Sequence, residues 1–205
     1  MLINTKTIEK VTRIDPRVKR TRKLLTIAFE ELMAEKDFQS ITVNDITDRA
    51  DVNRATFYLH FEDKYALLSY SLREAFTQML EQRLPGTHTF SMSHLTQLTV
   101  TLCEFMGNFY GHCHPGAHND DMTLILARLQ QQVYDLLLEW IGSTQQKLQQ
   151  PSAEYTASAL SWLIFGTAIQ AQSARPKQSS DKWVEQMLSL VRPGLQALVG
   201  DMAES

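Results

Sequence analysis

The sequence has little of what marks secreted, membrane-spanning or β-rich proteins. It contains two cysteines, Cys103 and Cys113, which are too few for a disulfide framework. No apolar run approaches the ~18 residues needed to cross a bilayer, and the polar, basic residues 1–23 have no apolar segment like that of a secretory signal. Alternating β-branched runs between turn signals are nearly absent. We therefore expect an all-α protein that resides in the cytoplasm.

Catalytic motifs are lacking too. The sequence contains no nucleophile elbow, no phosphate-binding loop and no paired helical metal motif. Its Ser, His and Asp residues have no spacing that indicates a catalytic set. We therefore expect neither an enzyme nor a cofactor.

Positive charge is concentrated at one end of the chain. The formal net charge is −3, yet residues 1–25 contain eight basic residues and two acidic ones, which gives them a local charge of +6. A basic end on an acidic body favours a protein that meets a polyanion with that end only. The arm of residues 1–15 either adds contacts to phosphates or a minor groove, or is a solvated tail; both interpretations stay open.

Helical periodicity predicts two helical domains behind a flexible arm. Asp15 can cap the first helix, and Pro16 suits its first position because the missing N–H would be unpaired there anyway. A fourth helix, which begins after Asp63, would join the two domains. We predict an arm of residues 1–15, a first domain of residues 16–62 and a second of residues 63–205. The longer helices of the second domain are expected near residues 91–111, 121–149, 153–174 and 181–199.

Residues 42–61 have the pattern of a helix, a tight turn and a second helix. Thr42, followed three residues later by Asp45, resembles a capping box. Asp51-Val52 makes the turn, and Asn53 is a strong N-cap for the next short helix. Two short helices joined in this way form a helix-turn-helix, whose second helix enters the major groove of DNA.

The same stretch resembles the DNA-binding signature of the tetracycline-repressor (TetR) family. The resemblance rests on Thr42-Val43-Asn44-Asp45-Ile46, on the block Thr56-Phe57-Tyr58-Leu59-His60-Phe61, and on Asp63-Lys64 with Leu67-Leu68. It covers residues 17–82 well and the rest of the chain only by architecture. It implies an N-terminal three-helix DNA-binding domain joined to a larger helical domain for dimerisation and effector binding.

The resemblance also implies roles for individual residues. Thr42, Tyr58 and Lys64 stand at positions that usually hold DNA phosphates in relatives. Four further residues stand at positions at or near the bases: Arg54, Ala55, Thr56 and His60. Val43 and Asn53, at the starts of the two helices, complete the set of expected DNA-binding residues. The planar guanidinium of Arg54 suits bidentate contact with guanine, whereas the alternative is that Tyr58 and His60 are ordinary surface residues.

Two positions depart from the family pattern. Asp51 stands in the turn where the family usually has glycine, and Ala55 replaces a glycine that is common in the second helix. Aspartate tolerates a left-handed backbone better than most residues, so we expect the turn to persist. The methyl group of Ala55 is suited to contact a thymine methyl.

The resemblance implies a homodimer that reads a palindromic site in double-stranded DNA and is released as a repressor by a small-molecule effector. The alternative is a regulator without a pocket, controlled by a protein partner, a metal or redox state; no membrane partner is expected. The sequence names no ligand-binding residue, because apolar candidates are more often plain core. Apolar stripes on the last two helices fit either a dimer interface or the monomer core. They comprise Leu160, Leu163, Ile164, Ala168 and Ala171, and Trp183, Met187, Leu190, Val191, Leu195 and Leu198.

The segment 111–121 gathers three histidines, Cys113 and two aspartates. Such side chains can bind zinc, copper or nickel, but the spacing around His112-Cys113-His114 fits no standard site. We expect a polar connecting loop and no metal. A redox switch between Cys103 and Cys113 is the other open alternative.

Overall fold

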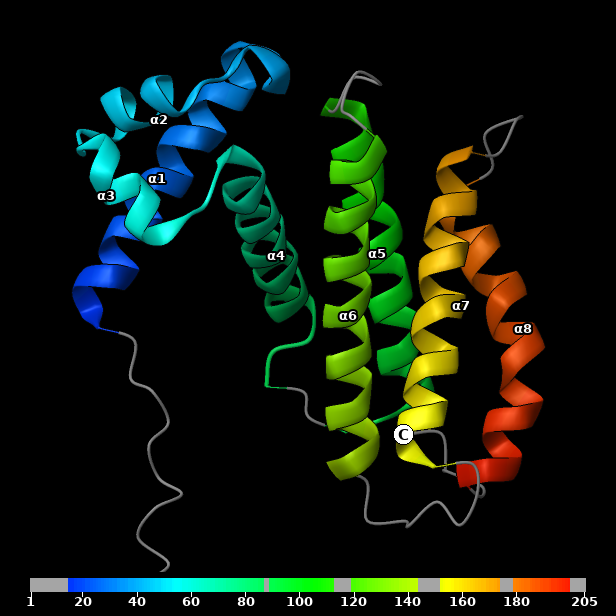
Figure 1. Cartoon of the computed structure of the whole chain (residues 1–205). Helices are drawn as coiled ribbons and strands as arrows, with labels where there is room; N and C mark the ends of the chain where they lie inside the picture. The colour runs from blue at the N-terminus through cyan, green and yellow to red at the C-terminus, as the bar shows by residue number, and fades with distance from the viewer. Residues whose placement is uncertain (1–14, 87–88, 113–118, 144–151, 174–178, 200–205) are drawn as a thin grey trace, which may run out of the picture. The chain divides into compact units, whose positions relative to one another are not determined.

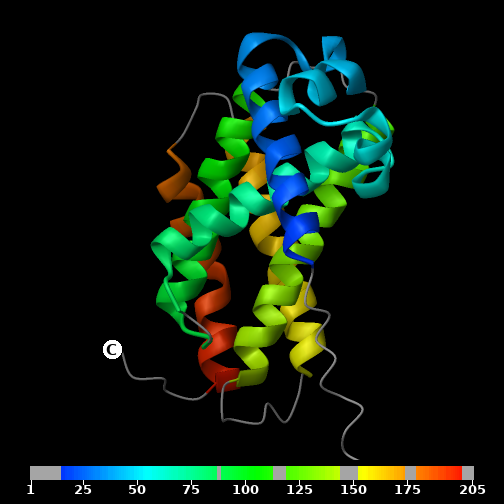
Figure 2. The ribbon, with the colours of Figure 1, turned by 90° about the vertical axis from the view of Figure 1, so that its left-hand side faces the viewer.

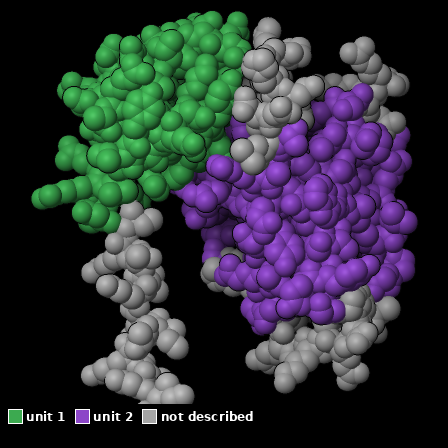
Figure 3. Space-filling model, in the orientation of Figure 1, with its two compact units in different colours: residues 1–71 green, residues 72–205 purple. Residues whose placement is uncertain are grey.

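The computed structural model describes residues 15–86, 89–112, 119–143, 152–173 and 179–199 (Figure 1). Within these ranges it contains eight α-helices and a 3₁₀ turn and has no strand, which confirms the all-α fold. The chain divides into two compact units, residues 1–71 and 72–205, which are described separately (Figure 3). Residues 1–14 of the basic arm lie outside the described ranges, so its role stays a prediction.

Unit 1 holds three complete helices and the beginning of a fourth. Its elements are α1 (Pro16–Glu35), a 3₁₀ turn (Phe38–Ser40), α2 (Val43–Ala50), α3 (Arg54–His60) and the first part of α4 (Lys64–Arg83). The expected start of α1 is confirmed, because the Asp15 carboxylate accepts the Arg17 N–H at 2.9 Å and Pro16 follows as the first helical residue.

The core of unit 1 draws on every one of these helices. Leu25, Phe29, Ile46, Phe57 and Leu67 are at most 1% exposed. An aromatic edge extends this core at the 3₁₀ turn, where the ring of Phe38 meets Phe29 at 6.0 Å and Tyr65 at 5.0 Å between centroids, both edge to face. These contacts hold α2 and α3 against α1, so the packed core of unit 1 supports the outer surfaces of α2 and α3.

Unit 2 is a bundle of longer helices. They are α5 (Met92–His112), α6 (Asn119–Ser143), α7 (Ala153–Ser173) and α8 (Ser180–Val199), together with the second part of α4. Helix α7 packs against α5, α6 and α8. Figure 1 shows α7 between α6 and α8, and Figure 2 shows the same ribbon turned by 90°. A buried polar link joins α6 to α7, where Gln130 Nε2 donates to Ser161 Oγ at 2.9 Å. None of the described helices is long and apolar enough to span a membrane.

Most of the apolar stripe on α7 lies in the core of its own unit. Leu160, Ile164, Ala168 and Ala171 are all buried, and from α8 Met187 and Leu195 join them. Leu163, Trp183 and Val191 are half-buried against this core, whereas Leu190 is exposed and the side chain of Leu198 lies outside the described set. The monomer core therefore accounts for most of the pattern, and a dimer needs other side chains as well.

Candidate DNA-binding surface

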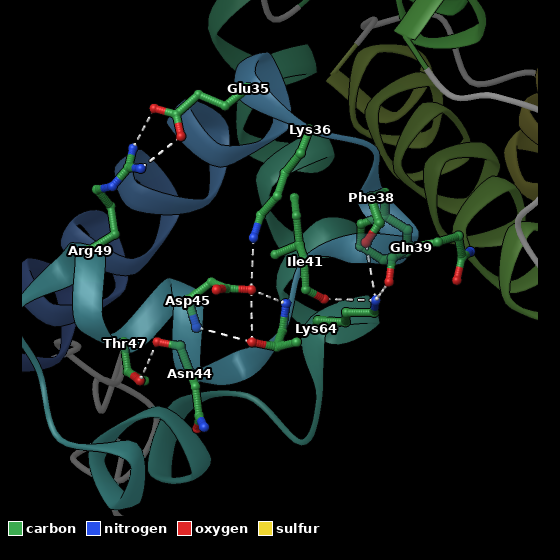
Figure 4. A network of polar contacts seen from close by, with 11 residues as sticks. Glu35, Lys36, Phe38, Gln39, Ile41, Asn44, Asp45, Thr47, Arg49 and Lys64 are labelled. Carbon is green, nitrogen blue, oxygen red and sulfur yellow. Dashed lines mark hydrogen bonds and ion pairs between the residues drawn. The ribbon is translucent and has the colours of Figure 1, made fainter.

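The beginning of α2 is held by the expected capping box. Thr42 Oγ1 accepts the Asp45 N–H at 3.1 Å, while the Asp45 carboxylate accepts the Thr42 N–H at 2.7 Å and its hydroxyl at 2.8 Å (Figure 4). Lys36 Nζ lies 2.9 Å from the same carboxylate. Hydrogen bonds from Lys36 and then from Thr42 hold the pKa of Asp45 at about 2. Both donors of Thr42 are thus engaged within unit 1.

The turn between α2 and α3 contains a left-handed residue. Asp51 has φ 52° and ψ 47°, and it is the one non-glycine residue with positive φ in the described part of the chain. The Val52 N–H donates to the Thr47 carbonyl at 3.0 Å and closes the turn. The expectation that aspartate supports this turn in place of glycine is confirmed.

Helix α3 presents one face to solvent and buries the other. Asn53 caps it by accepting the Ala55 N–H at 2.8 Å, as expected. Phe57 is fully buried and anchors the inner face. Arg54, Ala55 and Tyr58 are exposed on the outer face. The outer face can therefore enter a groove without uncovering the core.

Two exposed side chains of α3, those of Arg54 and Tyr58, contact each other. Arg54 Nη2 donates to Tyr58 Oη at 3.2 Å, and the guanidinium carbon lies 5.6 Å from the centroid of the Tyr58 ring. Thr56 and His60 are half-buried beside this face. Burial, and then the charge of Arg22, lower the pKa of His60, so its ring is neutral at neutral pH.

Leu59 was not anticipated from the sequence. Its side chain is 82% exposed and lies four residues beyond Ala55 on the outer face of α3. An exposed leucine on a polar helical face is suited to contact apolar base edges such as thymine methyls. The available signal was the position of Leu59 one turn after Ala55.

Lys64, the first residue of α4, is directed into unit 1. Its ammonium donates to three backbone carbonyls, those of Phe38 at 3.0 Å, Gln39 at 3.1 Å and Ile41 at 2.9 Å (Figure 4). It also lies 4.6 Å from the centroid of the Phe38 ring. Burial lowers the pKa of Lys64. The side chain ties the segment before α2 to the start of α4.

A second tie joins α2 to α1. Arg49 makes two parallel contacts with the Glu35 carboxylate, at 2.9 and 2.7 Å (Figure 4). It makes a longer contact with Glu31 at 3.4 Å. These carboxylates raise the pKa of Arg49, and the pKa of Glu35 is lowered in return. A bidentate pair of this kind fixes the orientation of the helix more than it adds stability.

Unit 1 thus brings all the expected DNA-binding residues onto α2, α3 and the start of α4. They differ in their partners. Thr42, Asn53 and Lys64 contact other parts of unit 1, whereas Arg54 and Tyr58 contact each other on the exposed face of α3. Ala55 is exposed on the same helix. Val43, Thr56 and His60 are half-buried. Their contacts with DNA stay a prediction.

The other candidate chemistry is largely outside the described residues. Residues 113–118, which include Cys113 and most of the histidine-rich loop, are not described. In the described ranges no group of three or more His, Cys, Asp or Glu side chains is placed to hold a metal ion. Cys103 is buried, and burial above all raises the pKa of its thiol to about 11. Such a thiol is unreactive at neutral pH.

Comparison with known proteins identifies relatives of part of the chain. Residues 28–70 match the model of a family described as bacterial regulatory proteins, tetR family. The uncharacterized HTH-type transcriptional regulator YxbF of Bacillus subtilis (strain 168) is 40% identical over 103 residues, which cover 49% of this chain and 27% of YxbF. The chain spans between about a quarter and two fifths of the length of the curated relatives it matches.

Solved structures resemble most of the chain in fold. The TetR-family repressor AlkX from Dietzia sp. strain DQ12-45-1b has a TM-score of 0.57 at 17% identity, covering 86% of this chain and 98% of AlkX. FadR from Thermus thermophilus, a TetR-family transcriptional repressor, has a TM-score of 0.53 at 23% identity, covering 90% of this chain and 98% of FadR. The matched proteins are described as transcriptional regulators or repressors.

Proposed function

Because residues 28–70 in unit 1 match the tetR family model, we propose that the chain is a transcriptional repressor of the TetR family that acts in the cytoplasm. It binds a palindromic operator as a homodimer and is released by a small-molecule effector. The observation that carries DNA binding is the exposed face of α3, where Arg54 and Tyr58 stand on a helix anchored by buried Phe57. A capped, supported helix with polar groups outward meets the geometric demand of the major groove.

Homodimerisation is supported by apolar side chains that unit 2 leaves exposed. Tyr155 is 68% exposed and Trp162, seven residues further along the same face of α7, is 61% exposed. Leu190 on α8 is 74% exposed, and α7 and α8 pack against each other. Large exposed apolar side chains on neighbouring helices are typical of an interface with a partner. A second copy of this chain satisfies the symmetry that a palindromic site requires.

Effector control is supported by a cavity of about 520 Å³ within unit 2, between α4 and α6. Pockets that bind small molecules usually measure about 300–1,000 Å³. Helix α4 contributes Phe76 and Leu80 to its lining and continues without a break to Lys64 in unit 1. A ligand that prefers one position of α4 would thereby bias the DNA-binding unit.

The cavity favours this mechanism over control by redox state or by a metal. The one cysteine described, Cys103, is buried with a raised thiol pKa, which disfavours its oxidation. In a regulator without a small-molecule pocket, side chains would fill the space between α4 and α6. Effector release is therefore the mechanism we propose.

Selection of bound sequences from random duplex DNA, at near-physiological salt, tests DNA recognition directly. We expect enrichment of a palindrome with half-sites about one helical turn apart, because two symmetric α3 helices enter successive major grooves. Binding that disappears with added salt and enriches no motif would contradict sequence-specific recognition. A single unpaired half-site would contradict the homodimer.

A further inference from the structure

We infer that α3 recognises thymine bases by their C5-methyl groups, and that Ala55 and Leu59 are the residues that determine this specificity. The inference rests on the proposed operator binding and names the chemical feature of the bases that the centre of α3 contacts. It follows from the exposure of Leu59, from the direction in which both side chains leave the helix, and from their continuity with the exposed groups of the DNA-binding surface.

Leu59 exposes a large apolar side chain to water. At 82%, it is the most exposed of the large apolar side chains in the described part of the chain, ahead of Leu190 at 74% and Tyr155 at 68%. A single exposed leucine is ordinary on a protein surface, so exposure alone assigns no role to it. The place of Leu59 on α3 is the observation that does.

Ala55 and Leu59 point away from the core of unit 1. Successive residues of an α-helix are rotated by about 100° around its axis. The direction opposite to the buried Phe57 therefore falls between Ala55 and Leu59, about 20° from each of them. Both residues are exposed, as this geometry requires. The most outward part of α3 is thus an apolar strip made of these two side chains.

Polar groups lie on both sides of the apolar strip. Arg54 and Tyr58 lie on one side, where the guanidinium donates to the Tyr58 hydroxyl at 3.2 Å. Thr56 and His60 lie on the other side and are half-buried. When the outer face of α3 enters a major groove, the strip meets base edges at the centre of the contact. The polar groups then meet bases or phosphates beside it.

Thymine is the natural base that offers an apolar group to this strip. The major-groove edges of the other three bases present hydrogen-bond donors and acceptors, whereas thymine adds its C5-methyl group. A donor or acceptor held against the apolar strip would lose water without gaining a hydrogen bond, which costs free energy. A methyl group in the same place buries apolar surface of both partners and is favoured.

The spacing of the two side chains limits the spacing of the thymines. Four residues of an α-helix span about 6 Å along its axis, and neighbouring base pairs are about 3.4 Å apart. We therefore expect each half-site to contain two thymines within about two base-pair steps of each other.

Replacement of thymine by deoxyuridine in the selected operator tests the inference, because it removes the methyl group and keeps base pairing. The full chain is titrated with duplexes that have one thymine position replaced in both half-sites. We expect about 10- to 25-fold weaker binding at two such positions, since each methyl group contributes about three- to fivefold in each half-site. Tolerance of uracil at every selected thymine would overturn the inference.

A second substitution separates the methyl group from the rest of the base pair. At a uracil-sensitive position, a cytosine–guanine pair should weaken binding, and 5-methylcytosine should recover about three- to fivefold in each half-site, because it returns the methyl group to the same edge. Equal affinity for cytosine and 5-methylcytosine would overturn recognition of the methyl group.

Two variants assign the methyl groups to residues. The ratio of the affinities for thymine and uracil is measured within each variant, so that any effect on the stability of α3 cancels. Leu59→Ala and Ala55→Gly should each reduce the sensitivity to uracil at one position and keep it at the other. Leu24→Ala, which truncates an exposed leucine of α1, is the matched control and should keep both. Unchanged uracil sensitivity in Leu59→Ala would overturn the role of Leu59.

The selected motif distinguishes failure of this inference from failure of the proposed function. A palindrome whose thymines all tolerate uracil would overturn recognition of the methyl groups and leave the regulator intact. A single half-site with uracil-sensitive thymines would contradict the homodimer and support recognition of the methyl groups by α3. Absence of any enriched motif would overturn sequence-specific binding and, with it, the inference that rests on it.

Discussion

The ammonium of Lys64 has three N–H donors, and the carbonyls of Phe38, Gln39 and Ile41 accept all of them. A DNA phosphate could accept a hydrogen bond from this ammonium only if one of these three bonds were broken. The backbone N–H at the start of α4 still points out of the helix and suits a phosphate. The side chain is therefore better suited to position the segment before α2 than to neutralise DNA.

Replacement of Lys64 by methionine distinguishes these two roles. We expect Lys64→Met to weaken operator binding while the slope of log K against log salt stays the same, since no phosphate contact is lost. A direct phosphate contact would instead reduce that slope by about 1. The free energy of unfolding should fall by about 1–2 kcal/mol, because three carbonyls lose their donor. Lys182→Met, an exposed lysine on α8, controls for loss of charge alone.

Asp45 makes unit 1 sensitive to acid. Hydrogen bonds from Lys36 and Thr42 lower its pKa from 3.8 to about 2, so the folded state binds the proton less tightly than the unfolded chain. This contribution to stability is fully present above about pH 4 and is lost as the pH falls toward 2. We expect the fall in Tm of Asp45→Asn between pH 5 and 2 to be smaller than that of the unchanged protein. Equal falls, followed by circular dichroism, would contradict the role of this carboxylate.

At the scale of single elements, local signals were sufficient for much of unit 1. Thr42 and Asp45 lie three residues apart and Asn53 lies two residues before the N–H it caps, so short sequence patterns contain these interactions completely. The contacts of Lys64 join residues 23 to 26 positions apart, and the bond from Gln130 to Ser161 spans 31. No local pattern contains such pairs, because packing of separate helices creates them.

Helical periodicity likewise could not decide whether an apolar stripe packs in the core of its own unit or faces a partner. Leu160 and Ile164 on α7 face the core of their own unit, whereas Trp162 between them is exposed. Both arrangements give the same repeat of about 3.6 residues. The residues that line the cavity between α4 and α6 could not be assigned from the sequence for a related reason, since Glu81 and Glu139 become neighbours of one space only in the folded unit.

We expect some side chains of α3 to contact DNA bases and others to contact DNA phosphates. Arg54→Ala is expected to relax the preference at one base pair in each half-site, with about 1–3 kcal/mol of discrimination lost there, because a guanidinium can bind guanine through two hydrogen bonds. Sequence selection with the variant would display the change. An unaltered motif would refute base contact by Arg54.

Tyr58→Phe is the companion variant on the same face of α3. It keeps the ring beside Arg54 and removes only the hydroxyl, which lies 3.2 Å from Arg54 Nη2. If that hydroxyl holds a phosphate, affinity should fall by a similar factor, about three- to tenfold, on every sequence. Titrations of the selected site and of scrambled DNA measure this, and an effect on one sequence alone would argue against a phosphate contact.

For the whole molecule, DNA recognition depends on two copies acting together. Trp162 is 61% exposed on α7 and contributes little to its own core, so Trp162→Glu should leave the monomer folded while it places a charge in the proposed interface. We expect sedimentation to show a dimer for the unchanged protein and a monomer for the variant. Affinity for the full palindrome should drop by roughly 100-fold or more, while affinity for a half-site stays the same, because the second site no longer binds intramolecularly. Ala127→Glu, which adds the same charge at an exposed position of α6, should remain dimeric. A variant Trp162→Glu that stays dimeric would move the interface away from this face of α7.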